Sequence, residues 1–85
     1  MIEINKQAAV DFNAASSKKV LEEIKKQASM GITTFYVRDI RVINSYHCVT
    51  GPLEEEGIEI CNRGCQSVGK IDGIDYFNIT FRLKS

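Results

Sequence analysis

The end of the chain alternates between polar and apolar side chains, and this pattern constrains the fold more than any other feature. Within residues 74–83, large apolar side chains occupy every second position: Phe77, Ile79, Phe81 and Leu83. Because successive side chains of a β-strand point to opposite faces, this spacing predicts a strand with one apolar face. Such a face needs neighbouring strands and a cover, and we expect residues 1–85 to supply both as a single domain.

A cover for this face is predicted in residues 14–30, which have the period of an amphipathic helix. Apolar side chains recur there at four-residue steps, at Val20, Ile24 and Ala28. The helix is expected to begin near Asn5 or, if Asn13 caps a shorter helix, at that residue. Gly31 is expected to end it, because glycine readily takes the left-handed conformation that closes many helices.

Two more strands are predicted between this helix and the closing strand. Residues 32–43 are rich in β-branched and aromatic side chains, and residues 57–61 alternate in polarity. The second of these strands is expected to pair with residues 74–83 as a hairpin. Gly51 and Pro52 are expected to break any regular element before it, leaving a single helical turn at residues 52–57.

Residues 62–73 are polar and rich in glycine, which predicts a long loop with a short strand at 68–71 and a tight turn at Asp72 and Gly73. The expected fold is therefore α+β. One long N-terminal helix packs on a small three-stranded, mainly antiparallel sheet, with a short helical link.

Residues 64–70 match the start of a phosphate-binding P-loop, G-x-x-x-x-G-K. That motif requires Ser or Thr at the next position to bind magnesium, whereas this chain has Ile71. The segment also runs into a turn instead of a helix. We therefore interpret its glycines as turn residues of a surface loop.

The chain has 11 basic and 11 acidic residues, so it has no excess charge for holding nucleic acid or an anionic membrane. Residues 1–52 carry seven bases and five acids, whereas residues 53–85 carry four bases and six acids. A core of this size gives marginal stability, which self-association supplements, and the complementary halves favour the same outcome. We expect a homo-oligomer.

The start of the chain lacks the apolar segment of a signal peptide, and no stretch approaches the roughly 20 apolar residues that span a bilayer. Three cysteines are too few for a secreted disulfide scaffold. These features predict an intracellular protein with free thiols.

Four residues are of the types that hold structural zinc or form a cysteine nucleophile: His47, Cys48, Cys61 and Cys65. Their spacing argues against both, because Cys61 lies in a predicted strand and the neighbours His47 and Cys48 point in different directions. We expect no cofactor and no enzyme activity, with Cys61 as a core thiol and Cys48 as a small hydrophobe. A zinc-stabilised interaction domain is an alternative.

The candidate surface for a ligand or partner consists of three cations and three tyrosines: Lys25, Arg38, Arg41, Tyr36, Tyr46 and Tyr76. The cations, together with Lys18, Lys19 and Lys26, suit a phosphate-bearing ligand. The tyrosines offer contact area at low entropic cost. In the alternative interpretation, the lysines only confer solubility and the tyrosines occupy half-buried strand positions.

The chain has a recognisable layout in three segments. A long N-terminal helix is predicted to end at Gly31 after residues 20–30, a short step leads into a strand at residues 53–60, and an aromatic strand closes the chain at residues 73–81. In this layout the chain resembles small accessory proteins encoded by tailed phages and prophages. The resemblance implies a binding role and brings no catalytic residues, because such proteins are virion components or bind and neutralise a host protein or signalling molecule.

The resulting expectation is a non-enzymatic, homo-oligomeric binding module that antagonises a host protein or signalling molecule. Its partners are then a second copy of itself and a host protein or small phosphate-bearing ligand, in the cytoplasm of a bacterial host. A virion structural component is the alternative.

Overall fold

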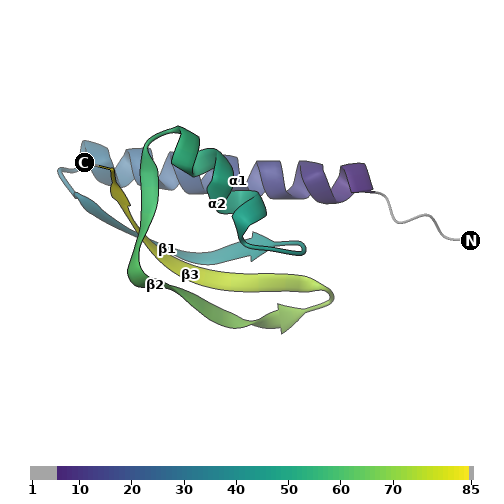
Figure 1. Cartoon of the computed structure of the whole chain (residues 1–85). Helices are drawn as coiled ribbons and strands as arrows, with labels where there is room; N and C mark the ends of the chain where they lie inside the picture. The colour runs from purple at the N-terminus through teal and green to yellow at the C-terminus, as the bar shows by residue number, and fades with distance from the viewer. Residues whose placement is uncertain (1–5, 85) are drawn as a thin grey trace, which may run out of the picture.

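The computed structural model describes residues 6–84, which form two helices and one three-stranded antiparallel sheet, so the predicted α+β class is correct (Figure 1). In chain order the elements are α1 (Lys6–Ser29), β1 (Thr34–Val42), α2 (His47–Glu55), β2 (Ile58–Ile71) and β3 (Ile74–Leu83). The strand order is β1-β3-β2. The strictly alternating strand is therefore the central one, where an apolar face is best covered. Asn5, the predicted start of the first helix, lies outside the described residues.

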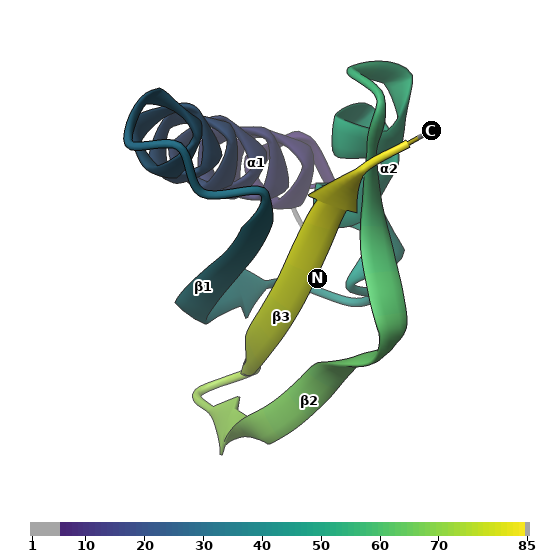
Figure 2. The ribbon, with the colours of Figure 1, turned by 90° about the vertical axis from the view of Figure 1, so that its left-hand side faces the viewer.

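Both helices lie on the same side of the sheet, and the core fills the space between the two layers (Figure 2). The predicted helix stripe supplies Val20 and Ile24, and the closing strand supplies Ile79 and Phe81. α1 packs on β1 and against α2. Both helices contribute to the core cluster that buries Ile79 and Phe81 of the central strand. Gly31 follows α1 with a φ of 84°, as predicted. On the opposite face of the sheet, the described part of the chain places no helix.

Two amide side chains of α1 are hydrogen-bonded to the backbone of β1 and its extension. Asn13 Nδ2 donates to Ile43 O at 3.0 Å, and Ile43 N donates to Asn13 Oδ1 at 2.9 Å. Gln27 Nε2 donates to Tyr36 O at 3.0 Å, and Tyr36 N donates to Gln27 Oε1 at 3.3 Å. Each amide thus makes the pair of bonds that a neighbouring strand would make. The alternative of Asn13 as a helix cap is wrong, because this residue lies within α1.

The spacing of these two contacts explains why α1 can follow the strand. Asn13 and Gln27 are about four helical turns apart, or ~21 Å. Tyr36 and Ile43 are separated by seven strand residues, or roughly 23 Å. The helix therefore runs along the free edge of β1 in the opposite direction and occupies that edge at both ends.

The short helical link is longer than predicted and begins before the Gly51–Pro52 pair. α2 starts at His47 and contains Pro52, whereas the sequence predicted one turn at residues 52–57. Packing explains the difference, because Val49 and Leu53 lie four residues apart and are 0% and 1% exposed. Ser17 Oγ also donates to Val49 O at 2.7 Å, which joins α2 to α1.

The predicted long loop is wrong at residues 62–67, because β2 continues to Ile71 and pairs with β3 on both sides of a register shift. The predicted short strand at 68–71 is confirmed as the outer end of β2. The tight turn at Asp72 and Gly73 is confirmed too, with φ values of 52° and 79°. The extra residues are absorbed by a bulge, where the register shifts between Ile60 and Cys65. Gly64 is needed there, since a Cβ at this position would lie 2.8 Å from Thr80 O.

The buried amide contact is expected to stabilise the fold more than the exposed one. Asn13 is 5% exposed, so Asn13→Ala leaves the Ile43 backbone groups without partners and should cost about 1–3 kcal/mol of unfolding free energy. Gln27→Ala is the matched control, because its exposed hydrogen bonds are replaced by water, and its cost should stay below about 1 kcal/mol. Urea unfolding of the two variants measures both values, and equal losses would contradict this account.

Candidate ligand-binding groove

Four of the six candidate surface residues lie together on the face of the sheet that the helices leave uncovered. Along β1 the burial alternates, with Phe35 and Val37 in the core and Tyr36 and Arg38 exposed. A bulge after Arg38 shifts the alternation by one residue. Arg41 therefore faces the same way as Tyr36 and Arg38, and it lies opposite Tyr76 of β3. The remaining two residues are elsewhere.

Lys25 and Tyr46 do not belong to this cluster. Lys25 is exposed on α1 and does not line the groove described below. Tyr46 packs on the helix side of the sheet, where its ring stacks on His47 with centroids 4.0 Å apart and lies 5.6 Å from Phe77. Tyr46 is thus half-buried, but it precedes α2 and does not occupy the strand position of the alternative interpretation.

Both arginines of the cluster are held over tyrosine rings. The Arg38 guanidinium carbon lies 5.6 Å from the centroid of Tyr36, and that of Arg41 lies 5.7 Å from the centroid of Tyr76. Within residues 6–84, neither guanidinium forms an ion pair or a side-chain hydrogen bond. Arg82 differs, because its Nε donates to Glu59 Oε1 at 2.9 Å. Arg38 and Arg41 are thus oriented cations whose N–H donors remain available.

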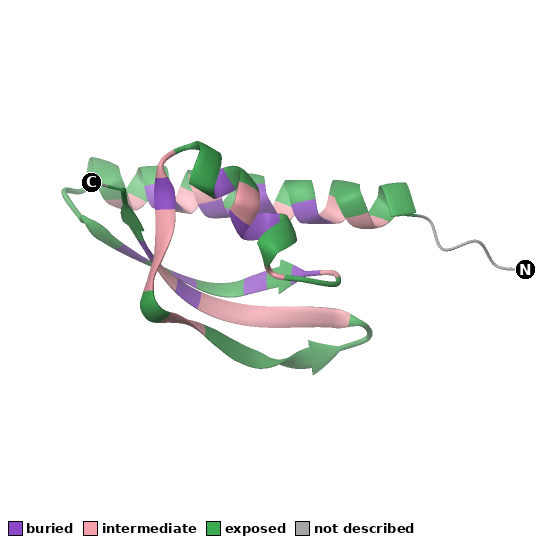
Figure 3. Ribbon diagram, viewed as in Figure 1, coloured by how far each residue is buried: buried purple, intermediate pink, exposed green. Residues whose placement is uncertain are grey.

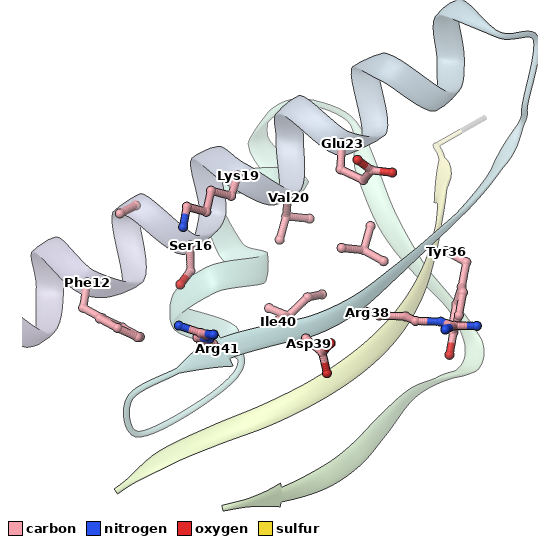
Figure 4. A pocket seen from close by; sticks show the side chains of 12 residues that line it. Phe12, Ser16, Lys19, Val20, Glu23, Tyr36, Arg38, Asp39, Ile40 and Arg41 are labelled. Atoms are coloured by element: carbon pink, nitrogen blue, oxygen red, sulfur yellow. The ribbon is translucent and has the colours of Figure 1, made fainter. Parts of the chain in front are cut away.

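A groove of about 710 Å³ lies between α1 and β1 beside these arginines (Figure 4). On the helix side it is lined by Phe12, Ser16, Lys19 and Glu23, and on the strand side by residues 36–41. The helix residues form a stripe at steps of three and four, next to the core stripe. That periodicity marks them in the sequence, but among them only Lys19 was included in the predicted basic surface.

The groove carries three cations and two acids. Lys19, Arg38 and Arg41 line it together with Glu23 and Asp39. Glu23 Oε1 accepts a hydrogen bond of 3.1 Å from Gln27 Nε2. Asp39 forms the bulge of β1 with a φ of 54°, and its N–H donates to Asn78 Oδ1 at 3.0 Å. The positive charges therefore exceed the negative ones, which favours an anionic ligand.

A second, smaller hollow of about 360 Å³ is lined by the same strand segment. It is lined by Arg41 and Tyr76 together with Asp39 of β1 and Val68 and Ile71 of β2. Because Asp39 and Arg41 line both hollows, this end of β1 separates the groove from the uncovered sheet face.

The cysteines and the histidine do not form a reactive cluster in the described part of the chain. Residues 6–84 contain no group of three or more His, Cys, Asp or Glu side chains placed to hold a metal ion. His47 Nδ1 lies 3.0 Å from Ser45 Oγ. Burial raises the pKa of the Cys65 thiol, which disfavours the thiolate that a nucleophile needs. Cys48 is exposed, so its predicted role as a small hydrophobe is wrong.

No helix among residues 6–84 has the length and apolar character needed to cross a membrane. No protein-family model, curated protein or solved structure matches this chain. The geometry of the groove and its arginines is therefore the basis for a functional proposal.

The three cysteines are expected to react with iodoacetamide in the order of their exposure and thiolate content. Cys48 is exposed and should react first, whereas Cys65 is half-buried with a raised pKa and should react last. Peptide mass spectrometry after short labelling at pH 8 measures the order. Labelling of Cys65 ahead of Cys48 would contradict this prediction and favour the cysteine nucleophile.

Proposed function

We propose that this protein is a non-enzymatic binding module that holds a small phosphate-bearing ligand at the rim of the groove, through Arg38 and Arg41. The observation that carries the proposal is the pair of guanidiniums held over Tyr36 and Tyr76, for which residues 6–84 supply no acidic partner. Arg82, by contrast, has its Nε bound to Glu59.

Stacking on a tyrosine ring prepares an arginine for an anion. The ring restricts the rotation of the long side chain, so less entropy is lost when a ligand binds. The planar guanidinium still presents its edge, which donates two parallel hydrogen bonds to a phosphate. Lys19 adds a third positive charge from the opposite wall of the groove.

Binding without catalysis is supported by the residues that surround these cations. The groove is lined by Ser16, Glu23 and Asp39, but by neither His47 nor any of the three cysteines. Among residues 6–84 no hydrogen bond joins the Ser16 hydroxyl to Glu23 or Asp39, so the lining pairs no serine nucleophile with a neighbouring base. Capture of a signalling molecule by such a site would antagonise the host system that uses it, which is the role that the phage resemblance implies.

Self-association is the second part of the proposal, and the outer half of β2 supports it. β2 is an edge strand, and residues 66–71 are all exposed (Figure 3). Val68 is 55% exposed and Ile71 is 61% exposed. Since α1 occupies both ends of the β1 edge, β2 offers the sheet edge at which the strand of a second copy can pair.

Removal of either arginine is expected to weaken binding of inorganic pyrophosphate, used as the probe. A charge-assisted hydrogen bond contributes about 1.5–3 kcal/mol, so Arg38→Gln and Arg41→Gln should each raise the Kd at least about tenfold. Arg82→Gln is the matched control, since this arginine is already paired, and it should leave the Kd nearly unchanged. Isothermal titration calorimetry measures the three values. Equal affinity for all variants, or no binding by the unmodified protein, would refute the proposal.

The oligomer is expected to depend on the β2 edge. Lysines placed there in two copies repel each other, so the double variant Val68→Lys, Ile71→Lys should be a monomer while the unmodified protein is a dimer. Val10→Lys is the control, because Val10 is similarly exposed, at 58%, but lies on α1. Size-exclusion chromatography with light scattering at micromolar concentration measures the mass. A monomeric unmodified protein would contradict the dimer.

A further inference from the structure

The groove between α1 and β1 is closed at both ends, which limits what can occupy it. At one end Asn13 is bonded to Ile43, and at the other Gln27 is bonded to Tyr36. These contacts are ~21 Å apart along the helix, so a long polymer cannot follow the strand edge through the groove. The volume of about 710 Å³ falls within the range of sites for small molecules.

The wall of the groove nearest to Arg41 is aromatic. Phe12 precedes Asn13, which binds Ile43, and Arg41 is two residues from Ile43, so Phe12 and Arg41 belong to the same end of the groove. Figure 4 shows the Phe12 ring pointing from α1 toward β1. The ring is only half-buried, so one part of it is open to a ligand. A flat aromatic group is the partner that such a ring binds best.

Hydrogen-bonding groups line the same end. In an antiparallel ladder, alternate residues direct their backbone N–H and C=O groups away from the partner strand. Ile43 is such a residue, because both of its backbone groups bind Asn13, and Arg41 two positions earlier faces the same edge. The Ser16 hydroxyl and the Lys19 amine lie across the groove. An aromatic ring placed here meets donors and acceptors at its rim.

From these observations we infer that the ligand is a nucleotide, whose base lies in the groove against Phe12 and whose phosphates bind Arg41 and Arg38. The inference rests on the proposed function, in which the arginines bind the phosphates. It adds that the rest of the ligand is a base, bound against Phe12. Three features carry it together: a groove of small-molecule size bounded at both ends, a half-exposed aromatic ring, and two guanidiniums on the same strand without an ion-pair partner among residues 6–84.

The test compares inorganic pyrophosphate with the nucleoside diphosphates ADP, GDP, CDP and UDP, which share the diphosphate and differ in the base. At least one of the four is expected to bind about tenfold or more tightly than pyrophosphate, because stacking of a base adds to the phosphate contacts. Phe12→Ala should abolish this difference and leave the Kd of pyrophosphate unchanged. Arg41→Gln should raise the Kd of pyrophosphate and of the preferred nucleotide alike.

Each outcome separates the inference from the proposed function. If pyrophosphate binds and no nucleoside diphosphate binds more tightly, the inference is wrong and the proposed function stands. If Phe12→Ala weakens the binding of pyrophosphate and of the nucleotide equally, Phe12 stabilises the fold and does not contact the base. The inference is then again wrong. Phe12→Leu, which keeps an apolar side chain of similar size without the ring, guards against unfolding and should also lose the preference for the nucleotide. If no probe binds the unmodified protein, both fail.

Discussion

The hydrogen bonds from Asn13 and Gln27 to the backbone of β1 are the contacts on which the rest of the structure depends. A three-stranded sheet has two free edges, and unpaired backbone groups at an edge invite association with other chains. Here the amide side chains of α1 replace a fourth strand at Tyr36 and Ile43. They set the direction of α1 along the strand, its height above the sheet and the two ends of the groove.

The bulge in β1 lies between these two contacts and shapes what the groove presents. The extra residue, Asp39, takes a left-handed φ and binds the Asn78 side chain, which shifts the register by one residue. Without this shift, Arg41 would face the core and Ile40 would face solvent. The bulge therefore keeps both arginines on the uncovered face, where each meets a tyrosine. The same irregularity that bends the strand assembles the candidate binding site.

Much of the fold could be predicted from the sequence, because the strongest patterns are also the ones that packing uses. The closing strand and the stripe at Val20 and Ile24 form the core as expected. The middle of β2, residues 62–67, was missed because Gly64 and the polar side chains around it are typical of loops, whereas pairing of Cys65, Gln66 and Ser67 with β3 continues the strand. Similarly, the polar Asn13 gave no signal of its tertiary role, since its partner Ile43 lies 30 residues away in the chain.

The candidate site was predicted only in part, for a comparable reason. Residue type suggested the arginines and tyrosines, and the period of a strand was enough to place Tyr36 and Arg38 on one face. The pairing of Arg41 with Tyr76 depends on the strand register and the bulge, which the sequence does not reveal. To predict the residues of α1 that line the groove, one would have to know which side of the helix lies along the edge of β1. Lys25 and Tyr46 lie apart from the other four residues, which residue type alone could not reveal.

Amide hydrogen exchange measured by NMR tests the central claim most directly, because it reports on individual backbone N–H groups. The backbone N–H groups of Tyr36, Arg41 and Ile43 all point away from β3. In an edge strand without α1, these three groups would exchange at similar, fast rates. If α1 replaces a fourth strand, the N–H of Ile43 should be strongly protected, that of Tyr36 protected to a lesser degree, and that of Arg41 exchanged rapidly. Equally fast exchange at all three residues would contradict the account.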